Sequence, residues 1–186
     1  MAFIDADEFL VPKRAASIPE ALAHLGEARN VSLPWHMFGR NGHQAAPEGG
    51  VVANYLRRAA DPMSDVRGVR AFKVIVDPCH LTALRVHSME TDGSEATCND
   101  AGRVVARETA RNAAGFYSAE HLQLNHYYTR SEAELAAKIG RGPNLAAKRS
   151  EYERKVRRTV ANIEAHEVED RAAVAYLARS GGCAPR

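Results

Sequence analysis

The sequence predicts an α/β or α+β fold in one unit, because strand-like apolar runs alternate with helical segments that carry capping signals. The chain has 186 residues, 45% of them hydrophobic and 26% charged, which is ordinary for a globular protein. No internal repeat is visible, and no window holds the ~18 consecutive apolar residues of a membrane span. We expect a single domain over residues 1–180, followed by a disordered tail at 181–186.

The expected strands are short apolar or β-branched runs that end at turn-forming residues. In chain order they cover residues 1–4, 31–38, 71–76, 84–86 and 122–128. The first is expected to be buried and to end at Asp5, and the fourth to pair with the third. Residues 88–118 are polar and weakly periodic, which indicates loops with a minor strand near 104–105.

The expected helices begin at capping residues or place their apolar residues on one face. In chain order they cover residues 17–25, 51–60, 131–139, 150–163 and 172–178. Ser131 and Glu134 have the spacing of a capping box. Gly140 and the pair Gly142-Pro143 are expected to end that helix.

Charge and cysteine content exclude several classes of protein. A net charge of +2 is too small to indicate nucleic-acid binding. The cysteines Cys79, Cys98 and Cys183 lie far apart, without a C-x-x-C pair. That spacing argues against a disulfide scaffold or a zinc ribbon, and it favours a reducing compartment, so we expect a cytoplasmic location.

Asp5-x-Asp7 follows the first apolar run and is the first motif that indicates chemistry. Two carboxylates two residues apart can converge on a hard divalent cation such as Mg²⁺ or Mn²⁺, which keeps positions open for phosphate oxygens. Glu8 adds a further carboxylate. A turn in which the aspartates cap the backbone is the alternative.

A second motif surrounds His126, which the strand expected at 122–128 would deliver to a loop. Arg130 and Ser131 follow at the start of a helix, and Lys138 and Arg141 add cations. A helix N-terminus and arginine side chains both attract phosphate. A buried structural histidine beside a solvated basic face is the alternative. Together, the two motifs match transfer chemistry on a nucleotide-activated substrate.

Several blocks of the sequence resemble the family 92-like (DUF23-type) branch of family 2 glycosyltransferases. The segment 3–10, Phe-Ile-Asp-Ala-Asp-Glu-Phe-Leu, is similar to that group's FIDxDEF signature. Segment 32–43 is similar to its second block, 73–78 with His87 to its third, and 125–131 with Lys138 and Arg141 to its closing signature. The segment 168–170 before Tyr176 is similar to the end of the pattern.

The resemblance implies a GT-A fold, a mixed sheet flanked by helices, and transfer of a sugar with inversion. The implied donor is a nucleotide sugar such as a UDP-sugar, the acceptor a saccharide or glycan, and the cofactor Mn²⁺ or Mg²⁺. The implied metal ligands are Asp5, Asp7 and His126, and the implied donor-phosphate ligands are Arg130, Ser131, Lys138 and Arg141. We expect Trp35, Asn41, Gly42 and His87 on the acceptor side; the aromatic face of Trp35 could stack on a sugar, and a core tryptophan is the alternative. The candidate bases are Glu48 and His43, with a solvated loop acid and a structural histidine as the alternatives.

In GT-A enzymes a β-α-β half that binds the nucleoside precedes the D-x-D motif. This sequence opens directly on the motif, so we expect a partial domain that lacks much of the N-terminal nucleotide-binding half.

Two other functions are compatible with the same residues. An apolar strand that ends in Asp-x-Asp also opens haloacid-dehalogenase-type phosphatases, in which Asp5 would be the nucleophile and Asp7 the general acid. A non-catalytic remnant or interaction module is the other, since the stretch 148–158 is basic and amphipathic enough to contact acidic lipid or a partner. Glu151 and Glu153 interrupt this stretch, which favours a solvated helix face.

Overall fold

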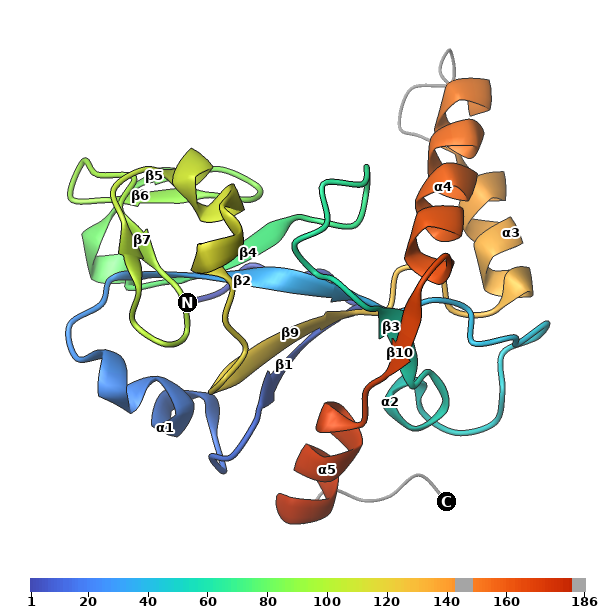
Figure 1. Ribbon diagram of the computed structural model, residues 1–186, viewed down its shortest axis with the longest axis horizontal. Helices are drawn as coiled ribbons and strands as arrows, with labels where there is room; N and C mark the ends of the chain where they lie inside the picture. The colour runs from blue at the N-terminus through green and yellow to red at the C-terminus, as the bar shows by residue number, and fades with distance from the viewer. Residues whose placement is uncertain (143–148, 182–186) are drawn as a thin grey trace.

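A mixed six-stranded sheet runs through the centre of the molecule (Figure 1). The computed structural model describes residues 1–142 and 149–181. The strand order is β1-β9-β2-β7-β8, and β4 pairs with β2 off this path. The strands are β1 (Glu8–Pro12), β2 (Asn30–Met37), β4 (Phe72–Val76), β7 (Thr97–Cys98), β8 (Val104–Val105) and β9 (Leu122–His126). β2 is parallel to β9 and β7, whereas β1 is antiparallel to β9 and β4 to β2.

Two further strand pairs flank this sheet. The hairpin of β5 (Leu81–Leu84) and β6 (Met89–Thr91) lies at one end, and β3 (Arg57–Ala59) pairs with β10 (Glu167–Glu169) at the other. Three short 3₁₀ helices belong to the connections at the end that holds the β5–β6 hairpin; they lie at Pro78–His80, Glu108–Asn112 and Ala114–Phe116. The two ends of the molecule are therefore built differently around a common sheet.

The helices α1, α3 and α4 bury their apolar faces in the core. α1 (Ile18–Leu22), continued by a 3₁₀ turn at Ala23–Leu25, packs on the sheet, where Ala21 joins a buried cluster with Val31 and Leu124. α3 (Glu132–Arg141) and α4 (Arg149–Glu164) lie side by side at the other end (Figure 1) and share the core residues Leu135, Ile139, Val156 and Val160. α2 (Val51–Asn54) and α5 (Ala172–Arg179) are short.

Most elements expected from the sequence are present. Strands are found at β2, β4, β8 and β9, and helices at α1, α3, α4 and α5, within a few residues of the expected bounds. The capping box of Ser131 and Glu134 forms in full. The mixed sheet flanked by helices confirms the predicted α/β class.

The expected buried strand at residues 1–4 is wrong. Met1 and Ala2 contact the backbone of β4 at Val76 and Ile75 but form no more than an isolated bridge, and Phe3 and Ile4 are 46% and 40% exposed. The first strand of the sheet is β1, which begins after the Asp-x-Asp motif, at Glu8. The phosphatase alternative depended on a buried strand that ends at Asp5, and the structure does not support it.

Two other expectations also differ. The helix expected at 51–60 ends at Asn54, because Asn41 Oδ1 accepts hydrogen bonds from the backbone N–H groups of Leu56 and Arg57 and the chain then pairs with β10. Residues 84–86 do not pair with β4, since β5 forms its own hairpin with β6.

Some expectations lie outside the described residues. These are Pro143 after α3, Lys148 at the start of the basic stretch, and the tail at 182–186; Gly181 is described and lies in a turn. Within the rest of that basic stretch, Glu153 and Arg157 form an ion pair on α4. In the described part of the chain, no helix is long and apolar enough to cross a membrane.

Candidate functional site

The strand register places several polar side chains on one face of the sheet. Glu8 of β1 lies directly opposite His126 of β9, and Met37 of β2 lies beside His126 on the other side. Lys73 of β4 pairs with Leu33, two positions before Trp35. Since directly paired residues point to the same side of a sheet, Glu8, Lys73, Trp35 and His126 share one face.

A tight turn before β1 presents the two aspartates. The N–H of Glu8 donates to the carbonyl of Asp5 (3.0 Å), and the N–H of Asp5 donates back to Glu8 Oε2 (2.8 Å). The carbonyl of Asp7 accepts from the N–H of Tyr127 (2.9 Å), which ties the turn to the end of β9. This backbone arrangement fixes where each carboxylate points.

The two carboxylates have different partners. Asp5 Oδ2 accepts a hydrogen bond from Lys73 Nζ (3.1 Å), and the Asp5 side chain remains 65% exposed. Asp7 Oδ1 lies 3.6 Å from His126 Nε2. The turn therefore separates the pair: Asp5 is neutralised by a lysine, and Asp7 faces an imidazole.

Asp7 is held in its ionised form. Burial alone raises the pKa of its carboxyl group, but the His126 side chain and the charge of Lys138 outweigh burial, so the pKa lies below its usual value. An ionised carboxylate beside an imidazole nitrogen can bind a divalent cation.

Asp7 opens into a cation-rich cavity of about 270 Å³ between β9 and α3. Its lining consists of Asp7, Tyr128, Thr129, Arg130, Glu134, Ala137, Lys138 and Arg141. Lys138 Nζ donates to the carbonyl of Tyr128 (2.8 Å) and lies 3.5 Å from the centroid of the Tyr128 ring. Burial lowers the pKa of Lys138, and the Asp7 charge partly opposes this effect. Arg130 adopts a left-handed backbone (φ 51°), uncommon outside glycine, and its side chain pairs with Glu134 (3.3 Å).

Ser131 does not line this cavity. It is fully buried, and its hydroxyl bonds within the capping box of α3, donating to Glu134 Oε2 and accepting from the Glu134 N–H. The N–H groups of Glu132 and Ala133 donate to the carbonyls of His43 and Gln44. The start of α3 thus has its N–H groups already bonded, unlike the open phosphate site that the sequence suggested. The cationic groups that line the cavity are the side chains of Arg130, Lys138 and Arg141.

Trp35 lies next to His126. Its ring packs edge-on against the rings of His126 (4.4 Å between centroids) and His87 (5.4 Å). His87 Nδ1 is in turn 3.1 Å from the carbonyl of Phe72. The structure therefore brings Trp35 and His87 of the expected acceptor side to the edge of the Asp7–His126 pair.

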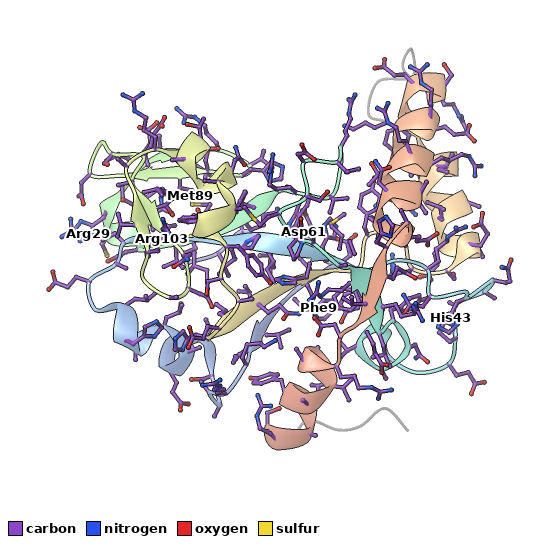
Figure 2. All side chains as sticks on the ribbon, viewed as in Figure 1. Phe9, Arg29, His43, Asp61, Met89 and Arg103 are labelled. Atoms are coloured by element: carbon purple, nitrogen blue, oxygen red, sulfur yellow. The ribbon has the colours of Figure 1, made fainter. Side chains whose placement is uncertain are left out.

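The remaining expected residues lie around a different cavity. Arg40, Asn41, Gly42 and His43 line a space of about 230 Å³ with carboxylates of α3, α4 and β10. Figure 2 shows His43 on the loop near α2, at the opposite end of the molecule from Met89 and Arg103. His43 Nε2 is 3.1 Å from the Asn54 carbonyl, and Asn41 uses both its amide nitrogen and its oxygen to hold β3. Glu48 is exposed on the same loop.

The residues suit a cation held partly by substrate. Among the residues that the structure describes, no group of three or more His, Cys, Asp or Glu side chains could hold a metal. Mg²⁺, however, is commonly held by one or two carboxylates plus substrate phosphates. Asp7 supplies one such carboxylate with His126 beside it, whereas Asp5 is hydrogen-bonded to Lys73.

Nothing in the sequence indicated Lys73, Tyr128 or Thr129 as site residues, although each lies in a segment that resembles the family. Lys73 is 5% exposed within an apolar strand, and a lysine in such a run is a signal for a buried ion pair. Tyr128 and Thr129 follow His126 directly, but only the fold shows that they face α3 across a cavity.

Comparison with known proteins finds one family match. The family model described as glycosyltransferase family 92 matches residues 1–159, which include the Asp-x-Asp turn, β9 and all of α3. No curated protein matches the chain.

Proposed function

The chain belongs to glycosyltransferase family 92 and is a glycosyltransferase; from this premise we propose that it transfers a sugar from a nucleotide-sugar donor to a saccharide or glycan acceptor. In this proposal Asp7 and His126 hold Mn²⁺ or Mg²⁺. The adjoining cavity receives the donor diphosphate. The observation that carries the proposal is that Asp7, which lies 3.6 Å from His126, lines the same cavity as Arg130, Lys138 and Arg141.

The cavity suits a diphosphate for electrostatic reasons. Two arginines and a lysine line the space together with two carboxylates, Asp7 and Glu134, and Glu134 is already paired with Arg130. A diphosphate bound there would pair with the cations and share the metal with Asp7, which removes the repulsion between carboxylate and phosphate. Lys138 is pre-positioned by its bond to the Tyr128 carbonyl, so little side-chain freedom is lost on binding.

The chemistry follows from where charge develops. A bound divalent cation neutralises negative charge that forms on the departing diphosphate. Lys138 and Arg141 of α3, and Arg130 just before it, line the cavity and would stabilise the same charge. Trp35, beside His126, offers an aromatic surface at the sugar end of the donor.

The acceptor base is assigned to neither His43 nor Glu48 in this proposal. His43 and Asp7 line separate cavities, and the imidazole of His43 already meets the Asn54 carbonyl. A base must lie within hydrogen-bond reach of the acceptor hydroxyl. Transfer with inversion and a UDP-linked donor remain parts of the proposal that follow from the family resemblance.

A thermal-shift assay on the protein tests the proposal. We expect UDP and UDP-sugars to stabilise the protein when Mn²⁺ is present and to lose that effect when EDTA is added. The control variant Lys155→Gln, which removes a cation from α4 outside the cavity, should show the same stabilisation as the wild type. Stabilisation that is equal with and without the metal would contradict the proposed metal site, and no stabilisation by any nucleotide sugar would contradict the donor cavity.

A further inference from the structure

We propose that Thr129 binds phosphate: its hydroxyl group donates a hydrogen bond to a phosphate oxygen of the molecule that occupies the cavity between β9 and α3. That this molecule is a nucleotide-sugar donor rests on the function proposed above, whereas the phosphate contact of Thr129 does not. The family resemblance assigned a phosphate role to Ser131, two residues further along the chain. The contacts of the two hydroxyl groups reverse that assignment.

The hydroxyl group of Thr129 is buried without a partner. Thr129 is 2% exposed, and its Oγ1 atom makes no hydrogen bond within the part of the chain that the structure describes. Buried hydroxyl groups are nearly always paired, because an unpaired one has lost its bonds to water and gained none in return. The hydroxyl of Thr129 therefore lacks a partner that a bound ligand can supply.

Thr129 also forms part of the wall of the cation-rich cavity. The cationic side chains that line the same space are those of Arg130, Lys138 and Arg141. An anion is the ligand that such a lining favours. Phosphate oxygens accept hydrogen bonds, and a hydroxyl hydrogen turns freely about its C–O bond, so Thr129 can donate to an oxygen that the cations hold.

The backbone on both sides of Thr129 is held in place. The carbonyl of Tyr128 accepts a hydrogen bond from Lys138 Nζ (2.8 Å), and Arg130 adopts the left-handed conformation (φ 51°) that turns the chain into α3. The N–H of Ser131 donates to Glu134 Oε2 (3.1 Å). Because this connection is ordered by its own contacts, a ligand that bonds Thr129 pays little for ordering it.

The hydroxyl group of Ser131 is in the opposite state. It donates to Glu134 Oε2 (2.8 Å) and accepts from the Glu134 N–H (3.3 Å). A phosphate could use Ser131 only by breaking this capping box, whereas Thr129 gives up no contact. Of the two hydroxyl groups on the connection into α3, the one at Thr129 is therefore the phosphate ligand.

The stability of the ligand-free protein gives the first test. Valine has nearly the shape of threonine but no hydroxyl group, so Thr129→Val removes an unpaired polar atom from a buried position. We expect the ligand-free variant to be at least as stable as the wild type in urea unfolding. A variant that is less stable, or that does not fold, would show that the hydroxyl group already has a partner inside the protein and would overturn the inference.

Calorimetric titration with UDP in the presence of Mn²⁺ gives the second test. Loss of one hydrogen bond to a charged group should weaken UDP binding by Thr129→Val about 10- to 100-fold. Thr129→Ser, which keeps the hydroxyl group, should bind UDP nearly as well as the wild type. Equal UDP affinity in the wild type and Thr129→Val would overturn the inference and leave the proposed function intact. An equal loss in Thr129→Ser and Thr129→Val would also overturn it, because packing and not the hydroxyl group would then be responsible.

Thr97→Val is the matched control. Thr97 is also buried, on β7, but its hydroxyl group is bonded to Asn30 Oδ1 (2.9 Å) and Ser32 Oγ (2.9 Å). We expect the reverse pattern for this variant, which is lower stability in urea and unchanged UDP affinity. A loss of UDP affinity in Thr97→Val as large as that in Thr129→Val would overturn the inference, since any buried hydroxyl group would then have the same effect.

Inorganic pyrophosphate at low ionic strength separates this inference from the proposed function. A wild-type protein that binds neither UDP nor a UDP-sugar would contradict the proposed function. Pyrophosphate binding that Thr129→Val weakens and Thr129→Ser preserves would still support Thr129 as a phosphate ligand. Pyrophosphate binding that is absent, or equal in the wild type and Thr129→Val, would in that case overturn the inference as well.

Discussion

The Oδ1 atom of Asp7 lies 3.6 Å from Nε2 of His126, although the two residues come from distant parts of the chain. The contact depends on β1 pairing with β9, which sets Glu8 opposite His126 and brings the turn at residues 5–8 to the end of β9. The carbonyl of Asp7 is held by the N–H of Tyr127 in the same region. The carboxylate is thus presented to the imidazole by backbone pairing, which does not depend on a bound ligand.

Lys138 should contribute to donor binding. Lys138→Gln removes the cation that lies on the Tyr128 ring and faces the cavity. Loss of one charge-assisted hydrogen bond corresponds to about a 10- to 100-fold rise in the donor KM. Steady-state kinetics with varied donor measures this effect. Lys155→Gln on α4 is the control, and an equal rise in that variant would show that general charge, and not the cavity, governs binding.

Ser131 should act as a helix cap and not as a phosphate ligand. Its hydroxyl is engaged with Glu134, so Ser131→Ala should lower the free energy of unfolding by about 1–2 kcal/mol. The donor KM should stay within about twofold of the wild type. Urea unfolding and kinetics measure the two quantities. Ser17→Ala, at the more exposed start of α1, is the matched change and should cost less; a large KM increase in Ser131→Ala with unchanged stability would contradict the cap assignment.

His36 should make the folded protein less stable in mild acid. Burial, followed by the nearby charge of Arg58, lowers the pKa of His36 from 6.5 to about 3. The unfolded chain therefore binds a proton that the folded chain does not as the pH falls from about 6.5 toward 3. The free energy of unfolding decreases in that window by up to about 1.4 kcal/mol per pH unit for this one group.

The His36→Gln variant tests that sign. Since glutamine does not titrate, the wild type should lose stability faster than the variant between pH 7 and pH 5, and urea unfolding at the two values measures the difference. His121→Gln, at a half-buried position near the start of β9, is the comparison. Parallel stability curves for the wild type and His36→Gln would mean that His36 is not held neutral.

The strongest local signals in the sequence predicted the fold well. The capping box at Ser131 and the spacing of Val156, Val160 and Ile163 are local patterns, and they identified α3 and α4. The segment 51–60 failed because its outcome depends on distant partners: Asn41 bonds the backbone after Tyr55, and β10 supplies a strand for residues 57–59. Such competition from tertiary contacts is invisible to periodicity.

The site was predictable in its residue types but not in its grouping. Asp7, His126 and Lys138 were all suggested by sequence; in the fold Asp7 lies beside His126 and lines one cavity with Lys138. The separation of Asp5 from Asp7 could not be inferred, because it depends on Lys73 reaching across from β4. The strand expected at residues 1–4 was placed on the wrong side of the aspartates. The apolar run that enters the sheet begins at Phe9, after the aspartates, and does not precede them.

Release of the nucleotide diphosphate from a nucleotide-sugar donor, compared between the wild type and Asp7→Asn with and without Mn²⁺, tests whether Asp7 holds the metal for sugar transfer. Asn keeps the shape of Asp7 but removes the charge that faces His126 and the cavity. We expect Mn²⁺-dependent release by the wild type and a loss of about 100-fold or more in Asp7→Asn, with Asp77→Asn, in the turn after β4, close to wild type. Equal metal-dependent release by the wild type and Asp7→Asn would contradict the account.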